Sequence, residues 1–112
     1  MAEIYTLLKR KAGLSAAEFQ DYYEGHHVPL CLRYMAGPVV YKRRFLTPTA
    51  GLPEPDFDVI TELGFPDEAM RDIVLSAMAA DQMPADVIAD ELNFIDRDAS
   101  RFYAADGHET QL

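Results

Sequence analysis

Residues 3–30 read EIYTLLKRKAGLSAAEFQDYYEGHHVPL, and this stretch decides the fold because it joins a strand to a capped helix. Residues 3–10 are β-rich and apolar in the middle, which predicts a first strand. Ser15 and Glu18 stand three positions apart. This is the spacing of a capping box, in which each side chain satisfies a free backbone N–H at a helix start. We therefore expect the first helix to begin near Ala16.

The two adjacent histidines of this stretch compete for one position. Pro29 disfavours the α conformation at the residue before it. We therefore expect a break across residues 25–29, followed by a short helical piece over 30–36. If the helix continued, Tyr22 would share a stripe with His26, and Tyr23 would share one with His27. Adjacent helical residues diverge by about 100°, so only one histidine can enter a given pocket.

The remaining elements follow from apolar alternation, prolines and helix-start signals. Pro66 and two acidic residues open a helix whose apolar face is expected to pack inward. That face comprises Met70, Ile73, Val74, Ala77 and Met78. A further helical piece over 83–96 is expected to turn Val87, Ile88, Leu92 and Ile95 inward. Strands are expected over 39–47, 57–65 and 100–110, with a proline-rich loop over 48–56.

The order β-α-β-β-α-β predicts one domain over residues 1–112. It is an α+β, ferredoxin-like fold with a four-stranded antiparallel sheet. Helices on one face of such a sheet leave the other face bare. Ile4, Thr6 and Leu8 lie on one face of the first strand and Tyr5, Leu7 and Lys9 on the other, so apolar side chains occur on both faces. A second copy of the chain would cover the bare face, which predicts a homodimer.

Composition argues against several classes of partner. The formal net charge is −9. A protein that binds nucleic acid or an anionic membrane usually carries a basic footprint, which is lacking here. Cys31 is the single cysteine, and no apolar run approaches the roughly 20 residues that cross a membrane. We therefore expect a cytoplasmic protein. Because the dinucleotide, phosphate-loop and serine-hydrolase motifs are missing, no cofactor is expected.

The order and spacing of several motifs resemble the EthD-domain family. The stretch LLKRKAGLSAAEFQDYYEGHHVPL resembles the family's basic strand end, Gly-Leu-Ser, paired helical aromatics and His-x-Pro-Leu, here residues 27–30. YKRRF, FDVITELGFPDEA and NFIDRDASRFYAADGHE resemble its later segments. His26 and Gly64 depart from the pattern. The resemblance implies a dimeric α+β barrel from a superfamily of cofactor-free isomerases, dehydratases, decarboxylases and oxygenases. Their substrates are small aromatic, lactone or polyketide-derived molecules.

His27 is the first candidate for acid–base chemistry, because its position matches the family motif. An unperturbed histidine pKa near 6.5 suits proton transfer at neutral pH. The alternative is a structural histidine that hydrogen-bonds a carbonyl freed by Pro29. A metal site that uses both histidines is not expected, since neighbouring histidines rarely converge on one ion. Cys31 is expected to be a buried structural thiol rather than a nucleophile.

Three further residues are candidates for the catalytic group. Tyr41 is expected to donate a hydrogen bond to a substrate oxygen, or else to be an ordinary core tyrosine. Asp58 and Glu62 share one face of the third strand, where buried carboxylates are costly unless paired or perturbed. Either one could orient His27 or relay a proton, or it could form an ion pair with a nearby arginine or lysine.

The substrate pocket is expected to be aromatic, lined by Tyr23, Phe19, Tyr5 and Phe65. These expectations favour a cofactor-independent lyase or isomerase that acts on a small hydrophobic or aromatic molecule. One alternative is a non-catalytic binding protein that assists an oxygenase of the P450 type. The other is a cofactor-free monooxygenase.

Overall fold

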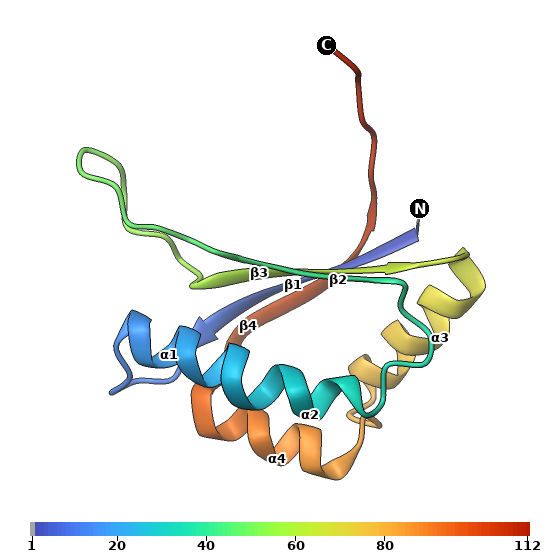
Figure 1. Ribbon diagram of the computed structural model, residues 1–112, viewed down its shortest axis with the longest axis horizontal. Coiled ribbons are helices and arrows are strands. Elements are labelled where there is room, and N and C mark those ends of the chain that lie inside the picture. The colour runs from blue at the N-terminus through green and yellow to red at the C-terminus, as the bar shows by residue number, and fades with distance from the viewer. Residues whose placement is uncertain (1) are drawn as a thin grey trace.

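The chain folds as one four-stranded sheet with helices on one side, as a computed structural model that describes residues 2–112 shows (Figure 1). The strands are β1 Ala2–Arg10, β2 Val40–Phe45, β3 Val59–Phe65 and β4 Ile95–Asp106. The helices are α1 Ala16–Tyr22, the π-helical turn η1 Tyr23–His27, α2 Val28–Leu32, α3 Glu68–Ala79 and α4 Ala85–Phe94. The segment that joins β2 to β3 and the C-terminal segment both extend away from the helices (Figure 1).

The sheet has the strand order β2-β3-β1-β4, and every neighbouring pair is antiparallel. This is the ferredoxin-like topology, so the predicted α+β class is confirmed. The register places Thr6 opposite Thr61 on β3 and Phe102 on β4. Side chains alternate along a strand, so these residues point to one face while Tyr5 and Glu62 point to the other.

The helix start at Ser15 follows the sequence prediction closely. The Glu18 backbone N–H donates to the Ser15 hydroxyl at 3.1 Å, and the Ser15 N–H donates to the Glu18 carboxylate at 2.9 Å. The helix then buries Phe19 against Phe94 of α4, with ring centroids 5.6 Å apart. The cap fixes where α1 begins, and the aromatic contact fixes which face it buries.

The expected break across residues 25–29 is wrong, because the helical path continues through a π turn. The Val28 N–H donates to the Tyr23 carbonyl, five residues back, and η1 leads directly into α2. A π turn accommodates one extra residue and occurs often at functional sites. Pro29, which has no N–H to donate, follows directly in the first turn of α2, where the π turn has already shifted the register of the helical hydrogen bonds.

Three other expectations about the second half of the chain need correction. β4 begins at Ile95 rather than residue 100, because the chain leaves α4 in an extended conformation and pairs at once with the end of β1. Leu92 is 55 % exposed instead of facing inward, and Phe94 is the fully buried residue of α4. The apolar face predicted on α3 packs inward in part: Val74 and Met78 lie half-buried against the core, whereas Met70 and Ile73 are 37 % and 66 % exposed.

The helices are too short or too polar to cross a bilayer. Within residues 2–112, none has both the length and the apolar character of a membrane span.

Candidate functional site

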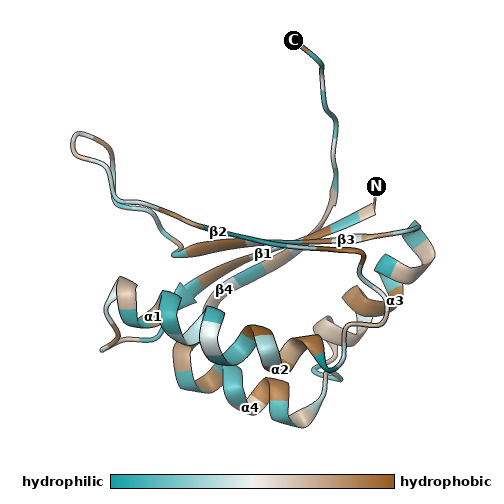
Figure 2. Cartoon of the chain, in the orientation of Figure 1, coloured by the Kyte–Doolittle hydropathy of each residue, from teal (hydrophilic) through white to brown (hydrophobic). Residues whose placement is uncertain are grey.

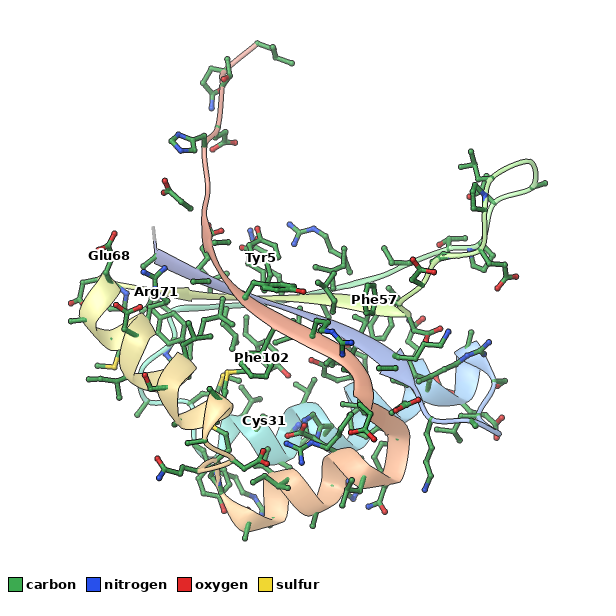
Figure 3. All side chains as sticks on the ribbon, turned by 180° about the vertical axis from the view of Figure 1, so that it is seen from behind. Tyr5, Cys31, Phe57, Glu68, Arg71 and Phe102 are labelled. Atoms are coloured by element: carbon green, nitrogen blue, oxygen red, sulfur yellow. The ribbon has the colours of Figure 1, made fainter. Side chains whose placement is uncertain are left out.

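A cavity of about 530 Å³ lies between the helices and the face of the sheet that they cover. Thr6, Thr61 and Tyr41 contribute from three strands, and Tyr23 and His27 from η1. Figure 3 shows Phe102 and Cys31 on this side of the sheet, with Tyr5 on the opposite side. The volume lies within the range of small-molecule sites, which are usually mostly apolar with a few convergent polar groups.

His27 is buried at the wall of this cavity, and both of its ring nitrogens have partners. Nδ1 lies 2.8 Å from the Asp90 carboxylate, and Nε2 lies 3.3 Å from the Cys31 sulfur. Because a carboxylate only accepts hydrogen bonds, Nδ1 carries the proton when the ring is neutral. Nε2 then carries the lone pair. It lies beside Cys31, which also lines the cavity.

Asp90 is shared by both histidines, which explains the adjacent pair in the sequence. Its second oxygen lies 3.0 Å from His26 Nδ1 and accepts a 2.6 Å hydrogen bond from the Tyr22 hydroxyl. His26 stacks on Tyr22 and is 61 % exposed, whereas His27 contacts Tyr23 edge-on and is 7 % exposed. The predicted pairing of each tyrosine with the histidine four residues later is confirmed, and His27 is the one in the cavity.

Burial and hydrogen bonding set the charges of this pair. Burial lowers the pKa of His27 below its ordinary value, and the Asp90 carboxylate offsets this effect only in part. Burial would raise the pKa of Asp90, but hydrogen bonds from Tyr22, His27 and His26 outweigh it and hold that pKa low. At neutral pH the site therefore contains a neutral imidazole oriented by a carboxylate, which is the arrangement of a general base.

Cys31 lies one helical turn after His27, and its thiol is the present partner of Nε2. Burial raises the pKa of the Cys31 thiol to about 12. The thiol is therefore protonated at neutral pH and acts as a weak hydrogen-bond donor to the imidazole.

A second polar group in the cavity is a chain of neutral hydroxyls. The Tyr41 hydroxyl donates to the Tyr23 hydroxyl at 3.3 Å, and Tyr23 shares a 2.7 Å hydrogen bond with Thr61. Burial raises the pKa of Tyr23 to about 12 and raises that of Tyr41 further. Both phenols stay protonated and remain able to donate to an oxygen of a bound molecule.

The carboxylates expected to assist His27 lie elsewhere. Glu62 is on the open face of the sheet, where it accepts a 2.6 Å hydrogen bond from Tyr5 and lies 3.5 Å from Arg44. Asp58 accepts a 2.7 Å hydrogen bond from the Arg10 backbone N–H and lies 3.4 Å from its guanidinium. The structure therefore brings together His27, Tyr41 and Tyr23, but not Glu62, Asp58 or Tyr5.

The remaining predicted pocket residues belong to the packed core. Phe19 is 1 % exposed and packs against Tyr23, Phe45 and Phe94. Phe65 is fully buried in a second cluster with Ile4 and Leu63. They support the walls of the cavity from behind.

Two acidic residues of α4 were missed by the sequence reasoning. Asp90 is the partner of His27, and the adjacent Glu91 lines the cavity. Burial raises the pKa of Glu91, and Arg97, 3.5 Å away, opposes this effect only in part. A signal was present, because Asp90 stands between Val87 and Phe94 at the spacing of a buried helix stripe. An acid in a buried stripe needs partners.

Among residues 2–112, no three histidine, cysteine, aspartate or glutamate side chains are grouped as a metal site would require.

The fold and the cavity together define an α+β protein whose ferredoxin-like sheet carries a histidine–aspartate pair over a small-molecule cavity. The family model of the EthD domain matches residues 11–98. The chain belongs to the EthD family, as its motifs indicated.

Solved structures share this fold at low sequence identity. An ethyl tert-butyl ether D (EthD) family protein from Bacillus halodurans is 18% identical, with a TM-score of 0.67, over 96% of this chain and 99% of that one. A protein from Arabidopsis thaliana is 13% identical, with a TM-score of 0.64, over the full length of both chains. A solution structure of the same Arabidopsis thaliana protein is 12% identical, with a TM-score of 0.62, over 99% of this chain and 91% of that one. No curated protein matches the chain.

Proposed function

We propose that this EthD-family protein is a cofactor-independent enzyme of the lyase, dehydratase or isomerase type. Its substrate would be a small aromatic, lactone or polyketide-derived molecule that carries a carbonyl group. The observation that supports this most directly is the buried pair of His27 and Asp90 at the wall of a mostly apolar cavity. A neutral imidazole with its Nδ1 proton held by a carboxylate has its Nε2 lone pair available for proton abstraction.

The proposed reaction begins with proton transfer next to the carbonyl. His27 Nε2 takes the C–H proton, and the bonding electron pair moves to the carbonyl oxygen as an enolate. Asp90 stabilises the imidazolium, while Tyr41 turns its hydroxyl from Tyr23 to the enolate oxygen. In an isomerisation, the imidazolium returns the proton to another carbon. In a dehydration, the enolate expels a β-hydroxyl group, which leaves as water with that proton.

Cys31 sets a condition on this reaction. Its thiol is the present partner of Nε2, so the substrate must displace a 3.3 Å sulfur contact before His27 can act. Thiols are weak hydrogen-bond donors, so the displacement costs little.

Hydrogen–deuterium exchange of 2-tetralone tests the proton transfer without knowledge of the natural substrate. This aromatic ketone has acidic C–H groups beside its carbonyl, and NMR in D₂O follows their exchange. We expect the wild-type protein to accelerate exchange, and His27→Gln to lower the protein-catalysed rate by roughly 100-fold or more. His26→Gln is the matched control and should keep most of the rate. An unchanged rate in folded His27→Gln would refute the assigned role.

The same experiment addresses the alternative of a non-catalytic binding protein that assists an oxygenase. The thiol on Nε2 favours that alternative, because it leaves the imidazole satisfied without a substrate. Such a protein would bind 2-tetralone, detected as chemical-shift changes of cavity residues, without accelerating exchange.

We also propose that two chains associate through the open faces of their sheets. Tyr5, Leu7 and Ile60 are only half-buried on this face, and Tyr103 is 54 % exposed. Within residues 2–112, the helices all lie on the opposite side of the sheet (Figure 1). Light scattering should give the mass of a dimer for the wild type and of a monomer for Leu7→Glu. A monomeric wild type at micromolar concentration would contradict the proposal.

A further inference from the structure

Helix α3 lies over the cavity, and it meets the packed core only through half-buried side chains. Its start is well defined, because the Asp67 carboxylate accepts the Met70 backbone N–H at 2.8 Å. Hydrophobic and hydrophilic residues recur along the helix (Figure 2), yet none of its side chains is buried. Met70, Val74 and Met78 line the cavity. Val74, Leu75 and Met78 also pack, half-buried, against the core cluster of Ile4, Leu63 and Phe65. The apolar face of α3 is therefore shared between this cluster and the open volume of the cavity.

Methionine dominates this side of the cavity. Four of the chain's five methionines line it: Met70 and Met78 from α3, Met35 from the segment before β2, and Met83 from the α3–α4 connection. Methionine is unbranched and flexible, so it adapts to ligands of different shape, and its sulfur makes favourable contacts with aromatic ring edges. A wall of this kind suits a flat ring better than a puckered aliphatic one.

Gly37 leaves room for one of these methionines. A Cβ at Gly37 would lie 3.1 Å from the Met70 sulfur, which is tighter than ordinary contacts allow. Met70 is 37 % exposed and also lines the cavity, so it lies where the cavity reaches the surface. Gly37 and Met70 therefore lie close together in the wall of the cavity.

We propose that Met35, Met70, Met78 and Met83 form the specificity surface of the cavity and select planar, uncharged aromatic alcohols or ketones. The oxygen of the ligand lies at the end formed by His27 and Tyr41, and its ring packs under α3. The ligand completes the partial apolar packing of α3, none of whose side chains is buried, so binding orders this helix more than α1, which already buries Phe19. This inference rests on the proposed function only in using the same cavity, since it concerns binding and not proton transfer.

Binding of three model alcohols, measured by NMR titration, tests the selectivity. Phenol has one aromatic ring, 2-naphthol has two, and trans-2-decalol has the carbon skeleton of 2-naphthol without its planarity. We expect 2-naphthol to bind about fivefold more tightly than phenol, because it buries more apolar surface. It should also bind more tightly than trans-2-decalol. Equal or tighter binding of trans-2-decalol, or no saturable binding of 2-naphthol, overturns the proposal.

Variants assign the selectivity to the methionines. In Met70→Leu/Met78→Leu the side chains keep their size but become branched and lose sulfur, so the preference for 2-naphthol over trans-2-decalol should fall by at least half. Ile73→Ala is the matched control on α3, because Ile73 is 66 % exposed, and it should keep the preference. A double variant that keeps the full preference overturns the assignment.

Amide hydrogen exchange on the wild-type protein provides a measurement that does not depend on a variant folding. Saturating 2-naphthol should slow exchange in Glu68–Ala79 more than in Ala16–Tyr22, which already packs on Phe94 through Phe19. Equal slowing in both helices overturns the ordering of α3. The His27→Gln variant separates the two proposals, because it should lose 2-tetralone exchange while it keeps the preference for the flat ring.

Discussion

Replacing Asp90 by asparagine probes the hydrogen-bond network that orients His27. Asp90 is 4 % exposed and accepts from Tyr22, His26 and His27 at 2.6, 3.0 and 2.8 Å. Asparagine keeps the shape but has only one accepting oxygen, and its other terminal group is a donor. Of the two possible amide orientations, the one that serves Tyr22 and His26 turns the amide N–H₂ toward His27 Nδ1.

This orientation satisfies more donors, and it reverses the tautomer of His27. Nδ1 must then accept from the amide, so the proton moves to Nε2, which points to the Cys31 sulfur. The alternative orientation leaves the amide facing the hydroxyl of Tyr22 and the ring of His26. Either way, one buried contact is weakened or lost, which costs about 1–3 kcal/mol of the free energy of unfolding. At this chain length, that corresponds to a fall in Tm of roughly 4–12 °C.

Two measurements check this reasoning on Asp90→Asn. Urea denaturation should give the lower free energy of unfolding with an unchanged m value, as expected for a change in stability alone. Nitrogen-15 NMR of the imidazole should show the Nδ1-protonated tautomer in the wild type and the Nε2-protonated one in the variant. Exchange of 2-tetralone should fall by roughly 100-fold, because Nε2 then carries a proton. Wild-type stability together with the wild-type tautomer would refute the role given to Asp90.

Three further predictions concern the core and the titrating groups around the cavity. Phe94→Ala should lower the free energy of unfolding by about 3–5 kcal/mol, because the side chain is fully buried, whereas Leu92→Ala on the same helix, at 55 % exposure, should cost far less. Urea titrations of both variants distinguish packing from helix propensity. The pKa of His27 in the folded protein lies below its ordinary value of 6.5. The stability that the neutral ring contributes is therefore fully present above pH 6.5 and is lost as the pH falls through the folded pKa. Thermal melts should show this loss in the wild type and a flatter profile in His27→Gln; parallel profiles would contradict it. The pKa of Glu91 is raised above 4.5, so its ionisation destabilises the fold as pH rises. Glu91→Gln should therefore raise Tm at pH 7 relative to the wild type and leave it unchanged near pH 4, whereas a lower Tm at pH 7 would show that the Arg97 contact outweighs burial.

The elements that the sequence predicted well are those with local signals. The capping box at Ser15 and Glu18 involves residues three apart, and the strand faces follow from simple alternation. The path through Pro29 was predicted wrongly because the local rule for residues before proline assumes an ordinary helix. A π turn at Tyr23–His27 escapes that rule, and nothing in the local spacing distinguishes it.

Of the predicted site residues, the histidine of the family motif and two tyrosines line the cavity, whereas the two predicted carboxylates do not. His27, Tyr23 and Tyr41 share the cavity as expected, since each lies on the covered side of its element. Glu62 pairs with Tyr5 because both alternate to the open face, and the choice between faces depends on which one the helices cover. The alternation of one strand leaves that choice undetermined.

Asp90 shows what sequence reasoning can gain from asking where polar residues interrupt an apolar stripe. It follows Val87 by three positions and precedes Phe94 by four, so a regular helix must bury it with them. A buried carboxylate is costly unless donors surround it, so its presence in the stripe implies donors elsewhere in the chain. Adjacent histidines preceded by adjacent tyrosines are such a set, because a helical path brings one of each pair to the same side. The buried acid and the doubled donors are thus two halves of one signal. Asp90 and His27 stand 63 residues apart, and each explains why the other is there.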